Sequence, residues 1–204
     1  MTDRPAGTAI DEDDLALTVT CRDARASRRE TPQLRWFTAH LAAESLPEDW
    51  GDDQPVVTDL ADAEMVLVGL GAGLEEAFLQ ADGIDYDLAG PLEALLELDR
   101  TTGLEKTFPD LRVVLIVDQV SVLGPLRGHG YAAAMIRELA THFGFLAGRG
   151  LLLAWPSPAS VEQLDPFTAR AATRRLEAIL NTLGMRPLGD SPIWCATFHT
   201  ISES

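Results

Sequence analysis

VSVLGPLRGHGYA, residues 120–132, joins a predicted strand to a predicted helix. The residues before this turn, 111–122, form an apolar and β-branched run that is typical of a central strand. The residues after it, 131–143, repeat apolar side chains at helical spacing, namely Met135, Ile136, Leu139, Ala140 and Phe143. The glycines and the proline between the two patterns favour a turn. The segment therefore predicts a strand, a turn and a helix in direct succession.

The rest of the second half continues this alternation. Residues 151–155 form a short apolar run after two glycines, which predicts another buried strand. Residues 168–183 predict a helix that ends before Gly184 and turns Ala172, Leu176, Ile179, Leu180 and Leu183 inward. A hairpin of residues 185–188 and 193–199 is expected to close the chain. Strands that alternate with helices predict a layered α/β domain.

The patterns in the first half are weaker. Residues 1–14 are acidic and offer few groups that could pack, which predicts a disordered tail. Residues 15–21 alternate apolar and polar side chains as a half-buried strand does. The other expected elements are a helix that starts at Pro32 and carries Leu34, Phe37 and Leu41, a loop over 47–55 and a strand over 64–70. Residues 73–107 predict two helices, with Gly83 and Gly90-Pro91 as breaks, and antiparallel strand is the alternative for this stretch.

The charge of the chain is strongly acidic and unevenly distributed. The 204 residues carry 16 basic and 32 acidic side chains, a formal net charge of −16 at pH 7. Residues 1–110 hold 25 of the acidic and 8 of the basic side chains, so residues 111–204 are close to neutral. Phosphate affinity comes mainly from Lys and Arg, so this composition argues against nucleic acid and anionic membranes as partners. It favours cationic partners instead.

Several features predict a cytoplasmic protein. The chain has two cysteines, Cys21 and Cys195, and no apolar leader after Met1, which indicates a reducing compartment. No apolar run approaches the roughly 20 residues that a membrane span needs. A chain of 204 residues can fold as one domain without a disulfide or a metal. We expect a monomer or a homodimer.

The turn at 127–132 has the properties of a phosphate site. The first N–H groups of a helix have no acceptor within the helix and lie at the positive end of its dipole. Gly128 and Gly130 lack a Cβ atom, so a ligand can approach the backbone closely. Arg127 adds a fixed positive charge. Backbone dipoles can therefore bind a phosphate or pyrophosphate even in a chain with a net charge of −16.

The run Arg127-Gly128-His129-Gly130-Tyr131-Ala132 resembles the Arg/Gln-x-x-Gly-x-Gly/Ala signature of the GNAT superfamily of N-acetyltransferases. The strand before it, the long helix after it and the order of elements across residues 111–199 agree with that family. The first half of the chain is similar to the family only in topology. The resemblance implies a layered α/β/α domain with a mixed, mostly antiparallel sheet that is splayed between the strands at 111–122 and 150–155.

The resemblance also implies a ligand and its binding residues. Residues 15–204 would form one acyltransferase domain, with an acidic acceptor-side half at 15–110 and a CoA-binding half at 111–199. Acetyl-CoA or another acyl-CoA would be the co-substrate, and no metal is expected. The backbone N–H groups of Arg127, Gly128, His129, Gly130, Tyr131 and Ala132 would hold the pyrophosphate, and the main chain of Val122 and Leu123 would pair with the pantetheine arm.

Asp118 is the candidate catalytic residue. It lies on the predicted strand nine residues before Arg127, where many family members carry an acidic residue. An amine must lose a proton before it can attack a thioester, and a carboxylate can take that proton. Asp118 could equally cap a turn or pair with an arginine. Many relatives also use a tyrosine to protonate the departing thiolate, whereas this chain has Leu180 at the corresponding place.

Other polar and aromatic residues are weaker candidates. His129 could donate to a CoA phosphate, but a solvent-facing side chain is the simpler interpretation. Cys195 and His199 have no further ligands nearby in sequence, so we expect no metal site there. Trp155 is expected to pack in the core.

The sequence leaves three hypotheses for function. The first is an acyl-CoA-dependent N-acyltransferase that transfers an acetyl group to a primary amine within a ternary complex. The acceptor would be a small molecule or a peptide, cationic because the acceptor side is acidic. The second is a non-catalytic GNAT-like module that binds CoA. The third is an acidic protein-interaction module that presents residues 1–110.

Overall fold

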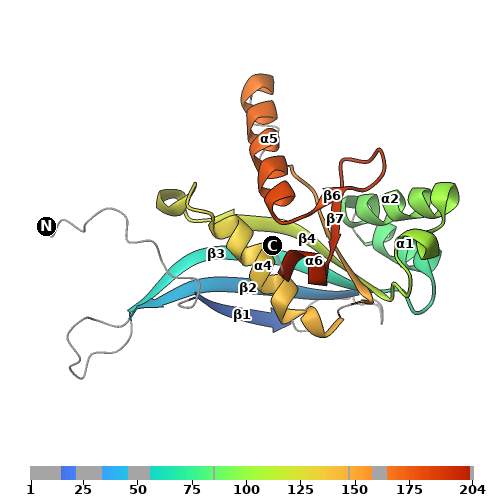
Figure 1. Ribbon diagram of the computed structural model, residues 1–204, viewed down its shortest axis with the longest axis horizontal. Helices are drawn as coiled ribbons and strands as arrows, with labels where there is room; N and C mark the ends of the chain where they lie inside the picture. The colour runs from blue at the N-terminus through green and yellow to red at the C-terminus, as the bar shows by residue number, and fades with distance from the viewer. Residues whose placement is uncertain are drawn as a thin grey trace, which may run out of the picture.

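A seven-stranded sheet forms the centre of the structure, with its strands in the order β1-β2-β3-β4-β5-β7-β6 (Figure 1). The computed structural model describes residues 15–21, 34–45, 56–84, 86–146, 148–157 and 165–202. The strands are β1 Leu15–Cys21, β2 Leu34–Ser45, β3 Val56–Gly69, β4 Val113–Val122, β5 Gly150–Ala154, β6 Arg186–Pro187 and β7 Trp194–Thr197. Among them only β4 and β5 run parallel, and every other neighbouring pair is antiparallel. The expected mixed, mostly antiparallel sheet is confirmed.

Helices cover both faces of this sheet. They are α1 Leu74–Asp82, α2 Tyr86–Thr102, α3 Leu104–Thr107, α4 Tyr131–His142, α5 Pro166–Thr182 and α6 Phe198–Ser202, with short 3₁₀ turns η3 Gly124–Leu126 and η4 Gly144–Leu146. Buried side chains of α1 and α2 pack on one face, and those of α4 and α6 pack on the other. Figure 1 shows α4 crossing the strands and α5 extending away from the sheet. The expected layered α/β class is therefore confirmed.

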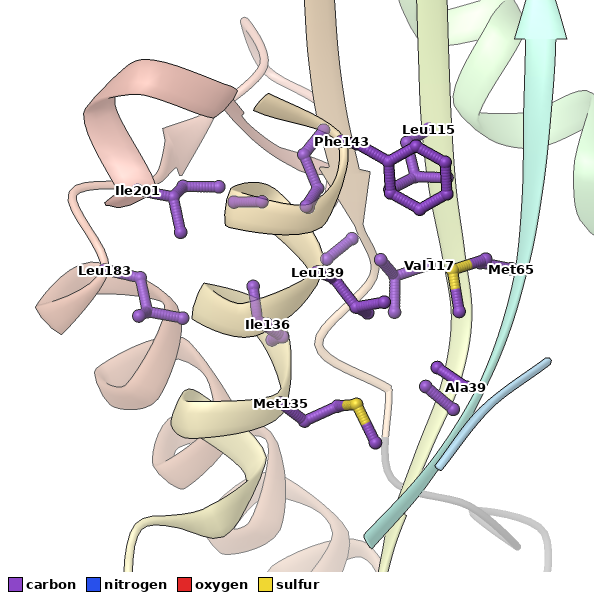
Figure 2. Close-up of a cluster of buried hydrophobic side chains, with 14 of the residues drawn as sticks. Ala39, Met65, Leu115, Val117, Met135, Ile136, Leu139, Phe143, Leu183 and Ile201 are labelled. Carbon is purple, nitrogen blue, oxygen red and sulfur yellow. The ribbon is translucent and has the colours of Figure 1, made fainter. Parts of the chain in front are cut away.

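The two faces of β4 enter two separate cores, which explains its continuous apolar run. Leu115 and Val117 face α4, whereas Val114 and Ile116 face α2. In Figure 2, Met135 and Leu139 of α4 are directed toward the sheet, and Leu183 and Ile201 lie on the other side of that helix. The amphipathic face expected for residues 131–143 is buried as predicted, because Met135, Ile136, Leu139, Ala140 and Phe143 all lie in this core.

The helix expected from Pro32 onward is wrong. Residues 34–45 form β2, which pairs with β1 on one side and β3 on the other. Phe37, Ala39 and Leu41 all face the α4 side, a spacing of two residues that belongs to a strand. The spacing of Leu34, Phe37 and Leu41 resembled a helix because small alanines occupy part of the buried stripe. Pairing on both sides outweighs the local helix propensity of those alanines.

Two further boundaries differ from the prediction. The strand expected over 64–70 is the end of β3, which already begins at Val56; the carboxylates in its first half disguised the strand. The break expected at Gly90-Pro91 lies inside α2. Leu88, Leu92 and Leu95 are buried on the sheet on both sides of the proline, so tertiary packing maintains the helix despite the missing N–H.

The remaining predictions in the C-terminal half hold with two changes. α5 is present, but only Leu180 of its residues is buried, and Ala172, Leu176 and Ile179 are half-exposed, because α5 extends beyond the sheet. The closing hairpin is present but short, and Phe198 and His199 belong to α6 rather than to its second strand. The predicted tail at 1–14 and the loop at 47–55 lie outside the described residues.

Within the described ranges, no helix is both long and apolar enough to cross a bilayer.

Candidate functional site

β4 and β5 pair over only part of the length of β4. The parallel register joins Val113–Val117 to Gly150–Ala154 and stops where β5 ends. β4 continues to Val122 along β3. Residues 118–122 therefore form a strand that has β3 on one side and no β5 partner on the other. The end of β4 therefore lies beyond the parallel pair and leads directly into the glycine turn.

Asp118 lies at the point where β5 stops. β3 pairs Met65 with Val117 and Glu64 with Gln119, so Asp118 is the extra residue of a β-bulge. Val117 and Val120 both face the α4 core, whereas Asp118 and Gln119 between them are exposed. Ordinary strand alternation already places Asp118 on the face opposite Val117, which α1 and α2 cover only in part. The bulge adds Gln119 to that same face and returns Val120 to the α4 core.

That face continues as a polar row across four strands. Thr18, His40, Asp62 and Ser121 lie opposite one another from β1 to β4. The next row contains Glu64 opposite Gln119. The surface beside Asp118 is therefore acidic, as the composition of residues 15–110 predicted for the half that the family resemblance assigns to the acceptor.

The turn between β4 and α4 contains both glycines of the motif in a backbone conformation that favours glycine. Gly128 has φ 88° and Gly130, the N-cap of α4, has φ 89°. A Cβ atom built on either one meets no other atom within 4 Å, so the space above both is open. No side chain caps α4, and the N–H groups of Tyr131 and Ala132 precede the first bonds to Gly130 O. These residues fit an anionic group such as a phosphate.

The contacts of Arg127, Val122 and Leu123 show how this turn is held on the sheet. The Arg127 Nε–H donates to the Val122 carbonyl over 3.2 Å, so this side chain folds back over the strand end. The Leu123 N–H donates to the Leu60 carbonyl of β3 over 3.3 Å. The Leu123 carbonyl accepts from Leu126 N–H over 2.9 Å. The Val122 carbonyl and both backbone groups of Leu123, the predicted pantetheine partners, therefore bond within the protein.

His129 and Tyr131 are neighbours within the turn. His129 Nδ1 lies 3.2 Å from the Leu126 carbonyl, and since a carbonyl only accepts, Nδ1 carries the proton. The two rings stack with their centroids 6.3 Å apart. His129 is exposed, Tyr131 is half-buried against the α4 core, and Ala132 is half-buried. The six motif residues thus span the turn after β4 and the first two residues of α4.

Three other sequence candidates have clear structural positions. Leu180 is buried in the α4 core and offers no proton to a leaving group. Burial raises the pKa of the Cys195 thiol to about 11. The expectation that Trp155 packs in the core is wrong: it is 45% exposed, because the chain leaves the sheet after Ala154. The Trp155 indole lies close to α2: a Cβ atom at Gly90 would be 3.6 Å from this ring.

A cluster that the sequence did not predict lies on the acidic face. His40 of β2 contacts Asp62 over 2.8 Å and Asp59 over 2.9 Å, both from β3. The hydrogen bond with Asp62 is the main cause that raises the pKa of His40 above 6.5. The signal was not visible in the sequence because these residues are 19 and 22 positions apart and β2 was predicted as a helix.

The best-defined cavity lies away from the glycine turn. A cavity of about 470 Å³ lies at the opposite end of β4, between Leu70, Leu74, Gly103, Leu104 and Leu111. Within the described ranges, His, Cys, Asp and Glu side chains form no group of three that could hold a metal.

The comparisons with known proteins assign no family to the chain. No protein-family model, no curated protein and no solved structure matches it significantly.

Proposed function

We propose that the protein is an acyl-CoA-dependent N-acyltransferase. The observation that carries this proposal is the glycine turn at the positive end of α4, directly after a strand whose far half has lost its β5 neighbour. A glycine turn at a helix N-terminus, directly after a strand that extends past its parallel neighbour, matches the two parts of CoA, a pyrophosphate followed by an extended amide chain. The finer architecture, a GNAT-like sheet splayed between β4 and β5, is part of this proposal.

The turn would bind the cofactor largely through its backbone. The N–H groups from Gly128 to Ala132 hold the pyrophosphate at the helix N-terminus, and the Arg127 guanidinium lies beside them. The pantetheine arm runs along the part of β4 that extends past the end of β5, between Gln119 and Val122. The thioester then lies near the bulge at Asp118, where β5 has ended and β4 continues.

The reaction is a direct transfer. Asp118, or a water that it binds, takes a proton from the ammonium group of the acceptor. The neutral nitrogen attacks the thioester carbonyl carbon, a C–N bond forms, the C–S bond breaks, and CoA leaves as a thiolate. The second proton of the nitrogen neutralises that thiolate. A thiol with an ordinary pKa of about 8.5 is a good leaving group, so Leu180 in place of an acid does not prevent the reaction.

The acceptor is a primary amine on a small molecule or a peptide. The face of the sheet beside Asp118 carries Asp59, Asp62 and Glu64 as well. Carboxylates raise the local concentration of cations and disfavour anions. A cationic amine is therefore the preferred class.

Binding of acetyl-CoA to the purified chain, measured by calorimetry, tests the proposal. Gly130→Ala should lose this binding, because an alanine at φ 89° moves the turn out of the conformation that presents its N–H groups. Gly189→Ala is the matched control: it strains another open glycine, at φ 60°, in the distant hairpin and should bind as the wild type does. Equal affinity of both variants would contradict the assignment of the turn, provided that both melt near the wild-type temperature.

Release of free CoA in the presence of a panel of amines separates an enzyme from a binding module. Binding without turnover for any amine supports the non-catalytic GNAT-like module, for which the buried Leu180 is the specific observation. The absence of binding supports the acidic protein-interaction module.

A further inference from the structure

His40 lies between two carboxylates on the open face of the sheet. Its Nδ1 is 2.8 Å from Asp62 Oδ1 and its Nε2 is 2.9 Å from Asp59 Oδ1. An ionised carboxylate only accepts hydrogen bonds, and a neutral imidazole has a single N–H. Both contacts can therefore form together only when His40 is the imidazolium cation. Loss of its proton must break one of them.

The surroundings of His40 favour the charged form. Thr18 faces it from β1, Asp59 and Asp62 face it from β3, and Glu64 is the next residue on the same side of β3. Ser121 of β4 follows Asp62 in the same row. The only other basic side chain within the described parts of β1 to β4 is Arg35, which pairs with Leu67 toward the far end of β3. The hydrogen bonds raise the pKa of His40, that of Asp62 most strongly, while partial burial acts in the opposite direction.

The two carboxylates flank an irregular point of β3. Ala61 pairs with Leu41 and Asp59 pairs with Ala42, so Leu60 between them is an extra residue. The Leu60 side chain is buried in the α4 core. Its carbonyl accepts the hydrogen bond from Leu123 N–H, the last residue before η3 and the glycine turn. Asp59, Leu60 and Leu123 thus connect His40 to the start of that turn.

We propose that His40 is a pH-sensitive positioning residue. As the imidazolium it bridges Asp59 and Asp62, fixes the bulge at Leu60, and so holds Leu123 and the turn that follows. When it loses its proton, one bridge opens and the bulge gains freedom. The part of this proposal that concerns acyl-CoA affinity rests on the proposed function, whereas the link between His40 and Leu123 does not.

The direction of the effect follows from the raised pKa. A group that binds its proton more tightly in the folded state stabilises that state fully below its unfolded pKa, here 6.5. The contribution disappears as the pH rises through the folded pKa. The turn should therefore be held best in mildly acidic solution and released in mildly basic solution.

An NMR titration of the full chain tests the link without any ligand. The His40 ring should titrate above the ordinary imidazole value of 6.5, and Asp62→Asn and Asp59→Asn should each lower its midpoint. The backbone amide of Leu123 should shift with the midpoint of His40 in the wild type and lose that transition in His40→Gln. The amide of Val68, at the other end of β3, is the control and should not follow His40. A Leu123 amide that titrates identically in His40→Gln overturns the positioning role.

Acetyl-CoA affinity then tests the coupling to the site. Between about pH 6 and about pH 8.5 the wild type should lose roughly three- to ten-fold in affinity, the effect of one hydrogen bond, while His40→Gln should show a smaller change. Equal pH dependence of both proteins contradicts the coupling. If neither protein binds acetyl-CoA at any pH, the proposed function fails, and the Leu123 titration still decides the positioning role.

Discussion

At the scale of single residues, β-bulges determine which polar side chains share the open face of the sheet. Strand alternation already directs Asp118 away from the α4 core, opposite Val117. The bulge adds one residue opposite β3 and places Gln119 on the open face beside this carboxylate. The same device at Leu60 directs Asp59 and Asp62 to one imidazole. Two irregular points in neighbouring strands therefore create most of the chemistry on this face.

Asp118→Asn should lower amine-dependent turnover by about a hundredfold, because an amide cannot accept the proton of the acceptor. Acetyl-CoA affinity should stay unchanged. Glu64→Gln is the matched control, since it removes an equal charge from the same face and should retain most of the activity. Steady-state rates with the best amine of the panel, together with calorimetry, measure both effects. Wild-type turnover in Asp118→Asn would remove this residue from the mechanism.

At the scale of elements, α5 depends on its own cap more than the other long helices do. It begins at Pro166, and the Asp165 carboxylate accepts hydrogen bonds from Phe167 N–H over 3.0 Å and Thr168 N–H over 3.1 Å. The bond from the Thr168 hydroxyl is the main cause that lowers the pKa of Asp165 below 3.8. Because α5 extends beyond the sheet, packing contributes little to its first turns.

Asp165→Ala should therefore increase hydrogen exchange of the amides in the first two turns of α5, because they lose their acceptor. The amides of α4 should exchange as before. In the wild type the same loss of protection should occur as the pH falls below 3.8, since a lowered pKa means that the cap is lost on acidification. Asp190→Ala, in the exposed turn before β7, serves as the control. Unchanged exchange in α5 of Asp165→Ala would contradict the role of the cap.

The elements also show what the sequence can and cannot predict. β1, β4, β5 and α4 were predictable because each shows a clean apolar period of two, an unbroken apolar run or a period near four. β2 was not, because its buried face is built partly from Ala39 and Ala43, which are also good helix formers. The motif from Arg127 to Ala132 was found from sequence alone. His40 with Asp59 and Asp62 was not, because only the register of β2 on β3 brings them together.

At the scale of the whole molecule, the C-terminal helix closes the structure over the start of β5. Phe198 of α6 is fully buried and occupies the space above Gly150. A Cβ atom at Gly150 would lie 2.0 Å from Phe198 Cε2 and 2.5 Å from Phe198 Cδ2. Phe198 also contacts Phe143 after α4, with ring centroids 6.5 Å apart. One missing methyl group thus lets the end of the chain pack against two distant elements.

Gly150→Ala should reduce the free energy of unfolding by about 2 kcal/mol, the usual cost of forcing an extra carbon into a packed core. Gly71→Ala is the control, because a Cβ atom there meets nothing within 4 Å. Urea denaturation followed by far-ultraviolet circular dichroism measures both variants. Equal midpoints for Gly150→Ala and the wild type would show that Phe198 can move aside without loss.

The single parallel pair of strands also has a consequence for synthesis. β1 to β4 come from residues 15–122 and lie on one side of the β4–β5 seam, while β5 to β7 come from residues 150–197 and lie on the other. No strand from the second part lies between strands of the first part in the sheet. A ribosome therefore completes every strand partner of the first part before it makes the second, so the N-terminal sheet can assemble on the nascent chain. β4 is the last strand of the part that is made first, and the glycine turn connects it to the part that is made later.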